Sequence, residues 1–161
     1  MRSIRSLALV FAGLSGLAPL AGCAPPAGPT GGPSPARGDT LTVAQMAELP
    51  LPVLEAGQTV RGALEAHDLV RRDDGTRADA FFYNGREGER ITITLRSSDF
   101  DSWVVLDDPD GPMREYDDDG AGGNDSRLSV TLPRTGRYLV LANSVSPGAT
   151  GAYTLRVDRT P

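Results

Sequence analysis

Short segments in which apolar and polar residues alternate fill the chain from about residue 58 onward. Every second residue is apolar in residues 91–95, 128–132 and 153–157, with Thr, Ser or Arg between. Successive side chains of a strand point to opposite faces of a sheet, so each segment predicts a strand with one face in a core and one in water. Residues 103–106 and 138–142 are apolar throughout, which suits central strands.

Turn signals separate these segments from one another and from two weaker strand candidates, residues 59–64 and 80–83. The turn pairs are Asp74 with Gly75, Asn84 with Gly85, Asp110 with Gly111, Thr135 with Gly136 and Pro147 with Gly148. About seven or eight short strands at this spacing predict an all-β fold, an antiparallel β-sandwich or jelly roll. Residues 43–49 predict one or two helical turns, ended by Pro50 and Pro52, and no strong helical periodicity follows.

The first 22 residues have the layout of a lipoprotein signal peptide. Arg2 and Arg5 give a positive start, residues 7–20 are almost wholly apolar, and small residues follow. The apolar run is short and interrupted by glycine, whereas a transmembrane helix needs about 20 apolar residues. The sequence at residues 20–23, LAGC, resembles a bacterial lipobox. That resemblance implies that Cys23 receives lipid and that the chain is cut before it.

The lone cysteine supports this interpretation. Cys23 is the single cysteine of the chain, so an internal disulfide is excluded and an exported thiol needs another explanation. An ordinary signal peptide with a chance cysteine is the alternative. Three acyl chains would anchor the protein firmly to a cell membrane or outer membrane. Ala24 stands where an Asp commonly retains lipoproteins on the inner membrane, which favours the outer membrane of a two-membrane bacterium and a periplasmic or extracellular domain.

The remainder divides into a tether and a domain. Residues 23–50 form the lipid-anchored, Pro/Gly-rich linker and a pre-domain segment, and residues 24–39 are expected to be disordered because they hold little to bury. Residues 51–161 form the β-sandwich domain. The chain has 16 basic and 21 acidic residues and a net charge of −5, which loss of the signal would lower by two. An acidic chain of this kind is not expected to bind nucleic acid by neutralising phosphates.

A series of motifs follows a recognisable order along the domain. They are residues 57–64, Asp79 with Phe81 and Tyr83, residues 88–91, Phe100 with Asp101, residues 106–111, Asp117 with Asp118, residues 136–138 and residues 151–155. From about Leu54 to Val157 the chain resembles the bacterial pre-peptidase C-terminal domain. The resemblance implies a β-sandwich of a kind usually appended to secreted peptidases and other exported enzymes. Some members bind calcium, and some bind protein or polysaccharide.

The sequence offers little for catalysis. The single histidine, His67, lies in a polar segment, and no G-x-S-x-G nucleophile motif is present. Nitrogen and sulfur ligands are too few for a zinc site. Asp99 and Asp101 would share one face of an extended segment, as a pair of hydrolase carboxylates could. Acidic residues here cluster beside Gly, Pro and Asn, where they serve turns. We therefore expect no enzyme and no catalytic residues.

An acidic, glycine-rich loop at residues 116–126 is the one candidate for a cofactor, which is calcium. Calcium takes 6–8 oxygen ligands, and a flexible loop rich in Asp and Asn can wrap it. The candidate ligands, with two from a neighbouring loop, are Asp99, Asp101, Asp117, Asp118, Asp119, Asn124 and Asp125. The alternative is a solvated turn.

The leading hypothesis is a non-catalytic cell-envelope lipoprotein whose sandwich is a binding or structural module for protein or polysaccharide. An accessory or folding partner of a separately encoded exported enzyme is the alternative, and a small carboxylate-dependent hydrolase is the third. A flat sandwich face with exposed aromatic residues would favour the first hypothesis. An open groove lined by carboxylates would favour the third.

Overall fold

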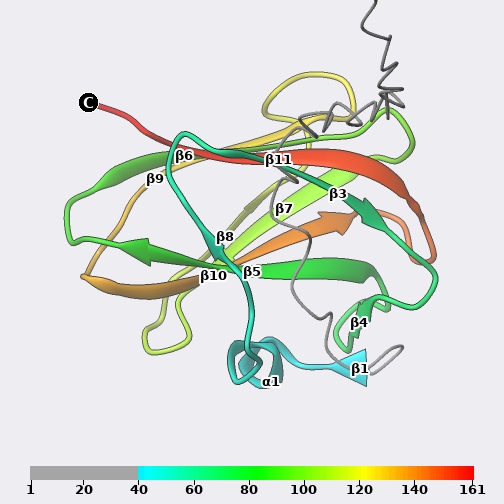
Figure 1. The fold of residues 1–161 in the computed structure, drawn as a ribbon, viewed down its shortest axis with the longest axis horizontal. Coiled ribbons are helices and arrows are strands. Elements are labelled where there is room, and N and C mark those ends of the chain that lie inside the picture. Colours follow the sequence, from blue (N-terminus) through cyan, green and yellow to red (C-terminus); the bar gives the residue numbers. More distant parts are fainter. Residues whose placement is uncertain (1–39) are drawn as a thin grey trace, which may run out of the picture.

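Residues 40–161 fold into two packed β-sheets with one short helix, as described by a computed structural model (Figure 1). The predicted signal peptide, Cys23 and the linker up to Asp39 lie outside the described residues. In chain order the elements are β1 Thr40–Leu41, α1 Val43–Ala47, β2 Val53–Leu54, β3 Thr59–Leu64, β4 Leu69–Arg71, β5 Arg77–Gly85, β6 Arg90–Arg96, β7 Ser102–Asp107, β8 Arg114–Asp117, β9 Ser126–Thr131, β10 Gly136–Ser144 and β11 Gly151–Arg159. No helix within this part of the chain is long and apolar enough to cross a bilayer.

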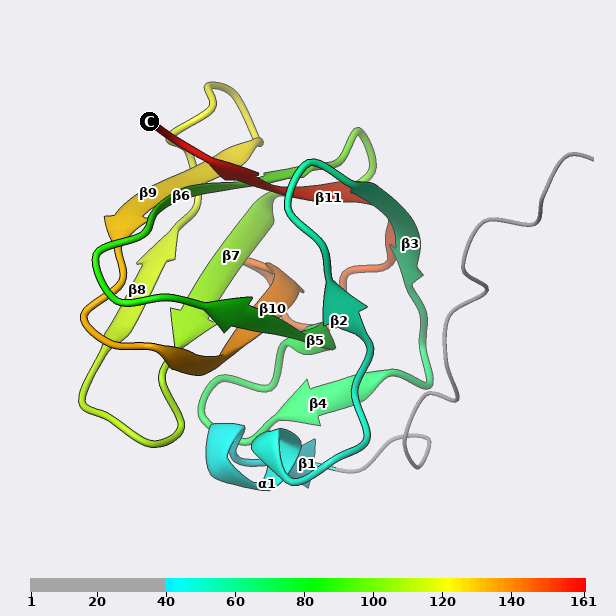
Figure 2. The same ribbon diagram turned by 60° about the vertical axis from the view of Figure 1, so that its left-hand side comes forward.

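The sheets have seven and four strands. The larger follows the order β1-β4-β5-β10-β7-β8, with β2 paired to β5 off this path, and the smaller follows β3-β11-β6-β9. Pairing is antiparallel apart from β1 with β4 and β2 with β5. The four-stranded sheet lies over one face of the seven-stranded sheet, and α1 lies on the other side (Figures 1 and 2). The predicted all-β sandwich is confirmed.

Seven segments predicted as strands correspond to β3, β5, β6, β7, β9, β10 and β11. The two wholly apolar runs form β7 and β10, which are inner strands of the larger sheet. The described part of the structure has eleven strands, more than the seven or eight expected. The four strands that were not predicted are β1, β2, β4 and β8, which are only two to four residues long. Strands of that length are too short to display a period of two.

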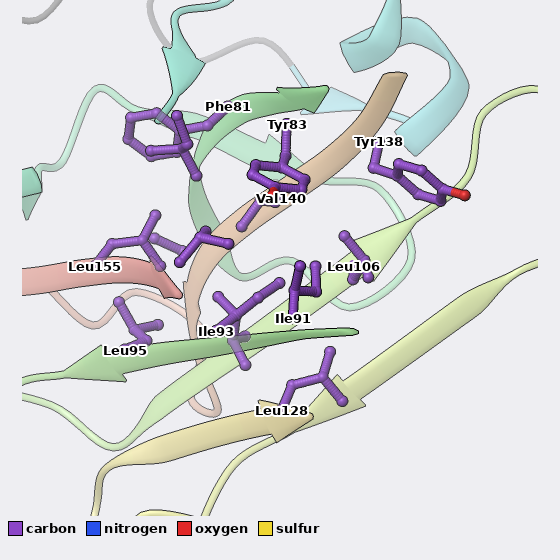
Figure 3. Close-up of a cluster of buried hydrophobic side chains, with 14 of the residues drawn as sticks. Phe81, Tyr83, Ile91, Ile93, Leu95, Leu106, Leu128, Tyr138, Val140 and Leu155 are labelled. Carbon is purple, nitrogen blue, oxygen red and sulfur yellow. The ribbon is translucent and has the colours of Figure 1, made fainter. Parts of the chain in front are cut away.

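The main core lies between the sheets. Phe81 and Tyr83 of β5 and Val140 of β10 face Ile93 of β6 and Leu155 of β11, and all five side chains are buried (Figure 3). Their positions follow the alternation in the sequence, since residues of one parity in each strand point inward.

A second core covers the far face of the larger sheet. Phe82 and Leu139 point away from the main core and pack in a cluster with Met46 of α1 and with Leu51. Thr42 begins α1 with a capping box, in which its hydroxyl accepts a hydrogen bond from the Gln45 backbone N–H. The packed unit therefore includes residues before Leu51, the expected start of the domain.

Several polar contacts link the two sheets through the core. Between β5 and β11 the Tyr153 hydroxyl donates to Asp79 Oδ2 at 2.5 Å, and the Tyr153 ring lies so close to Gly62 that a Cβ there would be 2.4 Å from the ring carbon Cζ. Near the same strand ends, between β7 and β9, the fully buried hydroxyls of Ser102 and Ser126 are 2.6 Å apart. These hydrogen bonds satisfy polar groups that would otherwise be costly to bury.

Burial raises the pKa of Asp79, and the hydrogen bond from Tyr153 lowers it by a smaller amount. The resulting pKa is about 6. A carboxyl with a raised pKa in the folded state favours folding while it is protonated. The contribution of Asp79 is therefore complete below about pH 4 and is lost as the pH rises through about 6, by up to about 3 kcal/mol of unfolding free energy.

We predict that Asp79→Asn removes this loss, because Asn stays neutral and its Oδ1 can still accept from Tyr153. Urea unfolding at about pH 4 and about pH 7 measures the effect. The variant should be more stable than the wild type at the higher pH and similar at the lower. Asp101→Asn, at an exposed position, serves as the control. Equal pH dependence in Asp79→Asn and in the wild type would contradict the assignment.

Candidate functional site

An aromatic pair stands on the outer face of the seven-stranded sheet, where β8 runs beside β7 (Figure 2). The Trp103 and Tyr116 rings meet edge to face, with centroids 6.0 Å apart and planes at 89°. Trp103 is half-buried against the second core, whereas Tyr116 is 65% exposed. Edge-to-face packing holds the Tyr116 ring in place while its free surface faces solvent.

Arg71 extends from β4 across the same face and covers Trp103. The guanidinium carbon lies 4.8 Å from the centroid of the Trp103 ring, within the range of a cation–π contact. The side chain is only 2% exposed, and its Nη1 lies 2.8 Å from Asp74 Oδ2, although the geometry is not that of a hydrogen bond. Burial lowers the Arg71 pKa, but a guanidinium stays charged at neutral pH.

Arg114 on β8 completes the rim of this surface. Its Nη2 lies 3.4 Å from Asp73 Oδ2 and its Nε lies 3.7 Å from Asp107 Oδ2. Burial raises the pKa of Asp107. We call Arg71, Trp103, Arg114 and Tyr116 the aromatic patch. It presents an exposed ring beside charged groups that already have partners, which is the make-up of a binding surface.

The sequence alone did not identify this patch. In the sequence Trp103 belongs to an apolar strand and Tyr116 begins the acidic loop, so neither residue indicates a contact between the two rings. Their contact depends on the register of β7 with β8, in which Val105 stands opposite Tyr116 and Trp103 is the diagonal neighbour. The sequence signal that could have indicated the patch is Tyr116, a single aromatic residue among the charged residues of β8.

The predicted calcium ligands lie in two loops and at the end of β8, and several of their side chains accept hydrogen bonds from backbone N–H groups. Asp117 Oδ1 accepts hydrogen bonds from the backbone N–H groups of Gly120 and Arg127, at 2.9 and 2.7 Å. Asp99 Oδ2 accepts from Ala152 N–H at 2.8 Å. At Asn124 and Asp101 the backbone carbonyls, not the side chains, accept hydrogen bonds, from the N–H groups of Ser102 and Val145 respectively.

Asp125 also has partners, since its Oδ1 accepts from Ser97 N–H at 3.3 Å and its Oδ2 lies 3.7 Å from Arg96 Nη1. Asp118 and Asp119 are exposed. Within residues 40–161, no three of the predicted carboxylates bring ligand atoms within 4.8 Å of one another. The predicted set therefore lacks a common carboxylate centre, and calcium binding stays a prediction.

The acidic and imidazole groups that do converge are Glu65, His67 and Asp68, whose ligand atoms all lie within 4.8 Å. His67 Nε2 is 2.9 Å from Glu65 Oε2, and both side chains are exposed. Asp68 is buried, and burial raises its pKa. The single histidine of the chain thus lies against a carboxylate at the turn before β4.

Comparison with known proteins gives one family match. Residues 77–144, from β5 to β10, match the family described as bacterial pre-peptidase C-terminal domain. This match confirms the resemblance seen in the sequence over those residues, which are less than half of the chain. A search of curated proteins finds no match.

Solved structures of similar shape have low sequence identity. The pre-peptidase C-terminal domain of collagenase from Bacillus anthracis is 20% identical, with 66% of this chain and 93% of that chain covered and a TM-score of 0.49. PliG of Aeromonas hydrophila, a periplasmic inhibitor of g-type lysozyme, is 17% identical, with 68% and 94% covered and a TM-score of 0.47. PliG of Salmonella Typhimurium is 15% identical, with 66% and 93% covered and a TM-score of 0.45.

We predict that Asp117→Ala lowers the unfolding free energy by about 1–3 kcal/mol, because two backbone donors lose a charged acceptor. Asp118→Ala, at an exposed neighbour, should change it by less than about 0.5 kcal/mol. Urea unfolding in the presence of a chelator measures both. Equal effects of the two substitutions would contradict the turn role of Asp117.

The same variants measured with calcium test the ligand hypothesis separately. A cation that binds only the folded state raises the melting temperature by mass action. If calcium and chelator give the same melting temperature for the wild type at equal ionic strength, the acidic loop is a solvated turn and the calcium hypothesis is wrong.

Proposed function

We propose that this chain is a non-catalytic binding module of the cell envelope, held to a membrane through lipid on Cys23. Its partner is a protein or a glycan that docks on the aromatic patch. The observation that carries the proposal is the Tyr116 ring, exposed on a sheet face and fixed against Trp103. An accessory role beside a separately encoded exported enzyme is the second candidate, favoured by the family match over residues 77–144.

The physical argument rests on how the patch is prepared for contact. An exposed aromatic ring contributes large contact area for few rotatable bonds, so little conformational entropy is lost when it is covered. The Trp103 ring packs against Tyr116, and the buried Arg71 packs on Trp103, so the motion of both rings is restricted. Arg114 and Tyr116 can offer donors to a polar partner at the margin. The patch thus combines an apolar centre with a polar rim, as protein-binding and sugar-binding surfaces do.

We predict that Tyr116→Ala weakens binding to envelope material by about tenfold or more, since truncation of an interface anchor commonly costs that much affinity. The full-length chain, immobilised through its C-terminus, is exposed to envelope extract divided into a protein fraction and a protein-free glycan fraction. The fraction that binds identifies the partner class.

Val145→Ala is the matched control, because Val145 is also an exposed apolar residue, at 41%, and belongs to no part of the patch. It should bind like the wild type. Undiminished binding by Tyr116→Ala, with a melting temperature equal to that of the wild type, would rule out the aromatic patch as the docking surface.

The anchor is tested by Cys23→Ser, because a serine hydroxyl does not replace the thiol in lipid attachment. We expect the variant to lose labelling by a fatty-acid probe and to leave the membrane fraction, while the wild type keeps both. A chain that fractionates with membranes equally well after the substitution would contradict the lipoprotein proposal.

A further inference from the structure

Four arginines lie close together on the outer face of the four-stranded sheet, and a fifth, Arg90, lies on the same face at the other end of β6. Side chains alternate along each strand, so the residues that do not enter the main core form one polar surface. This surface holds Arg61 of β3, Arg96 of β6, Arg127 of β9 and Arg156 of β11, with threonines between them. We call these four residues the arginine face.

The register places the arginines in a staggered array. Thr154 stands between Arg61 and Arg96 across the sheet. In the next row Arg156 lies between Thr59 and Thr94, and Thr94 separates it from Arg127. Arginines in one row are therefore two strand spacings apart, roughly 10 Å, and no two stand directly opposite each other. This arrangement avoids the repulsion that like charges in direct cross-strand pairs would cause.

Counter-charges balance only half of the array. Arg156 Nε and Nη2 lie 2.7–2.9 Å from the Asp158 carboxylate, and Arg96 Nη1 lies 3.7 Å from Asp125 Oδ2. Arg61 and Arg127 form no ion pair within residues 40–161. The face thus carries more positive than negative charge, although the chain as a whole has a net charge of −5.

The face is hollowed rather than flat. Two shallow depressions of about 500 and 370 Å³ lie on it, and both are lined by Arg96 and Thr154. The first extends to Arg61 and the second to Arg127 and Arg156. The two depressions adjoin at Arg96 and Thr154, and between them all four arginines contribute to the lining. We call the two depressions together the trough.

We propose that this trough binds a linear acidic polysaccharide whose carboxylates pair with the arginines. A guanidinium matches a carboxylate with two parallel hydrogen bonds, and threonine hydroxyls can donate to or accept from sugar hydroxyls. A polymer can reach several guanidiniums at once, so weak single contacts add up through effective concentration.

A protein partner fits this surface less well. The large exposed hydrophobic residues of the described chain are Val53, Tyr116 and Val145, and none of them belongs to the arginine face. Protein interfaces depend on buried aromatic or aliphatic anchors, which the trough does not offer. The face also lies on the opposite side of the sandwich from the aromatic patch, so the proposal does not depend on the function proposed above (Figure 1).

The test measures binding of the full-length chain in non-ionic detergent to polygalacturonate, with dextran as the neutral polymer and phosphatidylglycerol vesicles as an anionic lipid surface. The wild type should bind polygalacturonate and neither of the others. Arg61→Gln with Arg127→Gln should weaken binding about tenfold or more, because the two arginines without protein counter-charges are lost. Raising salt from about 0.1 M to about 1 M should also weaken wild-type binding, because the Debye length falls from about 10 Å to about 3 Å and charges are screened more strongly.

Arg72→Gln with Arg86→Gln is the matched control, since it removes the same charge at two exposed positions away from the face. It should bind like the wild type, as should Tyr116→Ala. Arg61→Lys with Arg127→Lys, which keeps the charge and loses the paired donors, should fall between. Failure of the wild type to bind polygalacturonate, equal binding to dextran or to vesicles, or equal losses in the two glutamine double variants would overturn the proposal.

Discussion

The strands β5, β10 and β7 are apolar on both faces, and the rest of the molecule depends on covering them. Phe81 and Phe82 are neighbours in the chain but belong to separate cores, because alternate side chains point to opposite faces. The four-stranded sheet covers one face. The segment with α1 and Leu51 covers the other face. The sequence up to residue 50 had predicted a linker and pre-domain segment rather than a part of the packed domain. Where this second cover ends, Trp103 is left half-buried, and the aromatic patch forms beside it.

The fold was largely readable from the sequence because its main strands carry strong local signals. The apolar runs of β7 and β10 and the alternation in β6, β9 and β11 each indicate a burial pattern that a sandwich satisfies. The short strands could not be predicted in this way. In β1 two residues pair in parallel with β4, and in β2 two pair with β5, so these strands exist because of distant neighbours rather than local propensity.

The candidate sites were harder to predict, for two physical reasons. Asp117 and Asp99 suggested metal ligands by composition, yet their oxygens accept backbone hydrogen bonds, a role that Asp takes wherever chains turn tightly. The aromatic patch and the arginine face depend instead on cross-strand register, which joins residues far apart in the chain. Arg61 and Arg127 follow the outward parity of their own strands, but only the strand order places β3 and β9 at opposite edges of one sheet.

The parallel pairing of β1 with β4 also has a consequence for where a force on the chain would act first. A pull transmitted along the chain into Thr40 first loads a pairing of two residues, Thr40 with Val70 and Leu41 with Arg71. The next structure in line is α1, whose Met46 holds it to the second core. The main sandwich lies behind both. A pull at Thr40 would therefore load this two-residue pairing and the packing of α1 before it reaches the eight-residue pairing of β10 with β5.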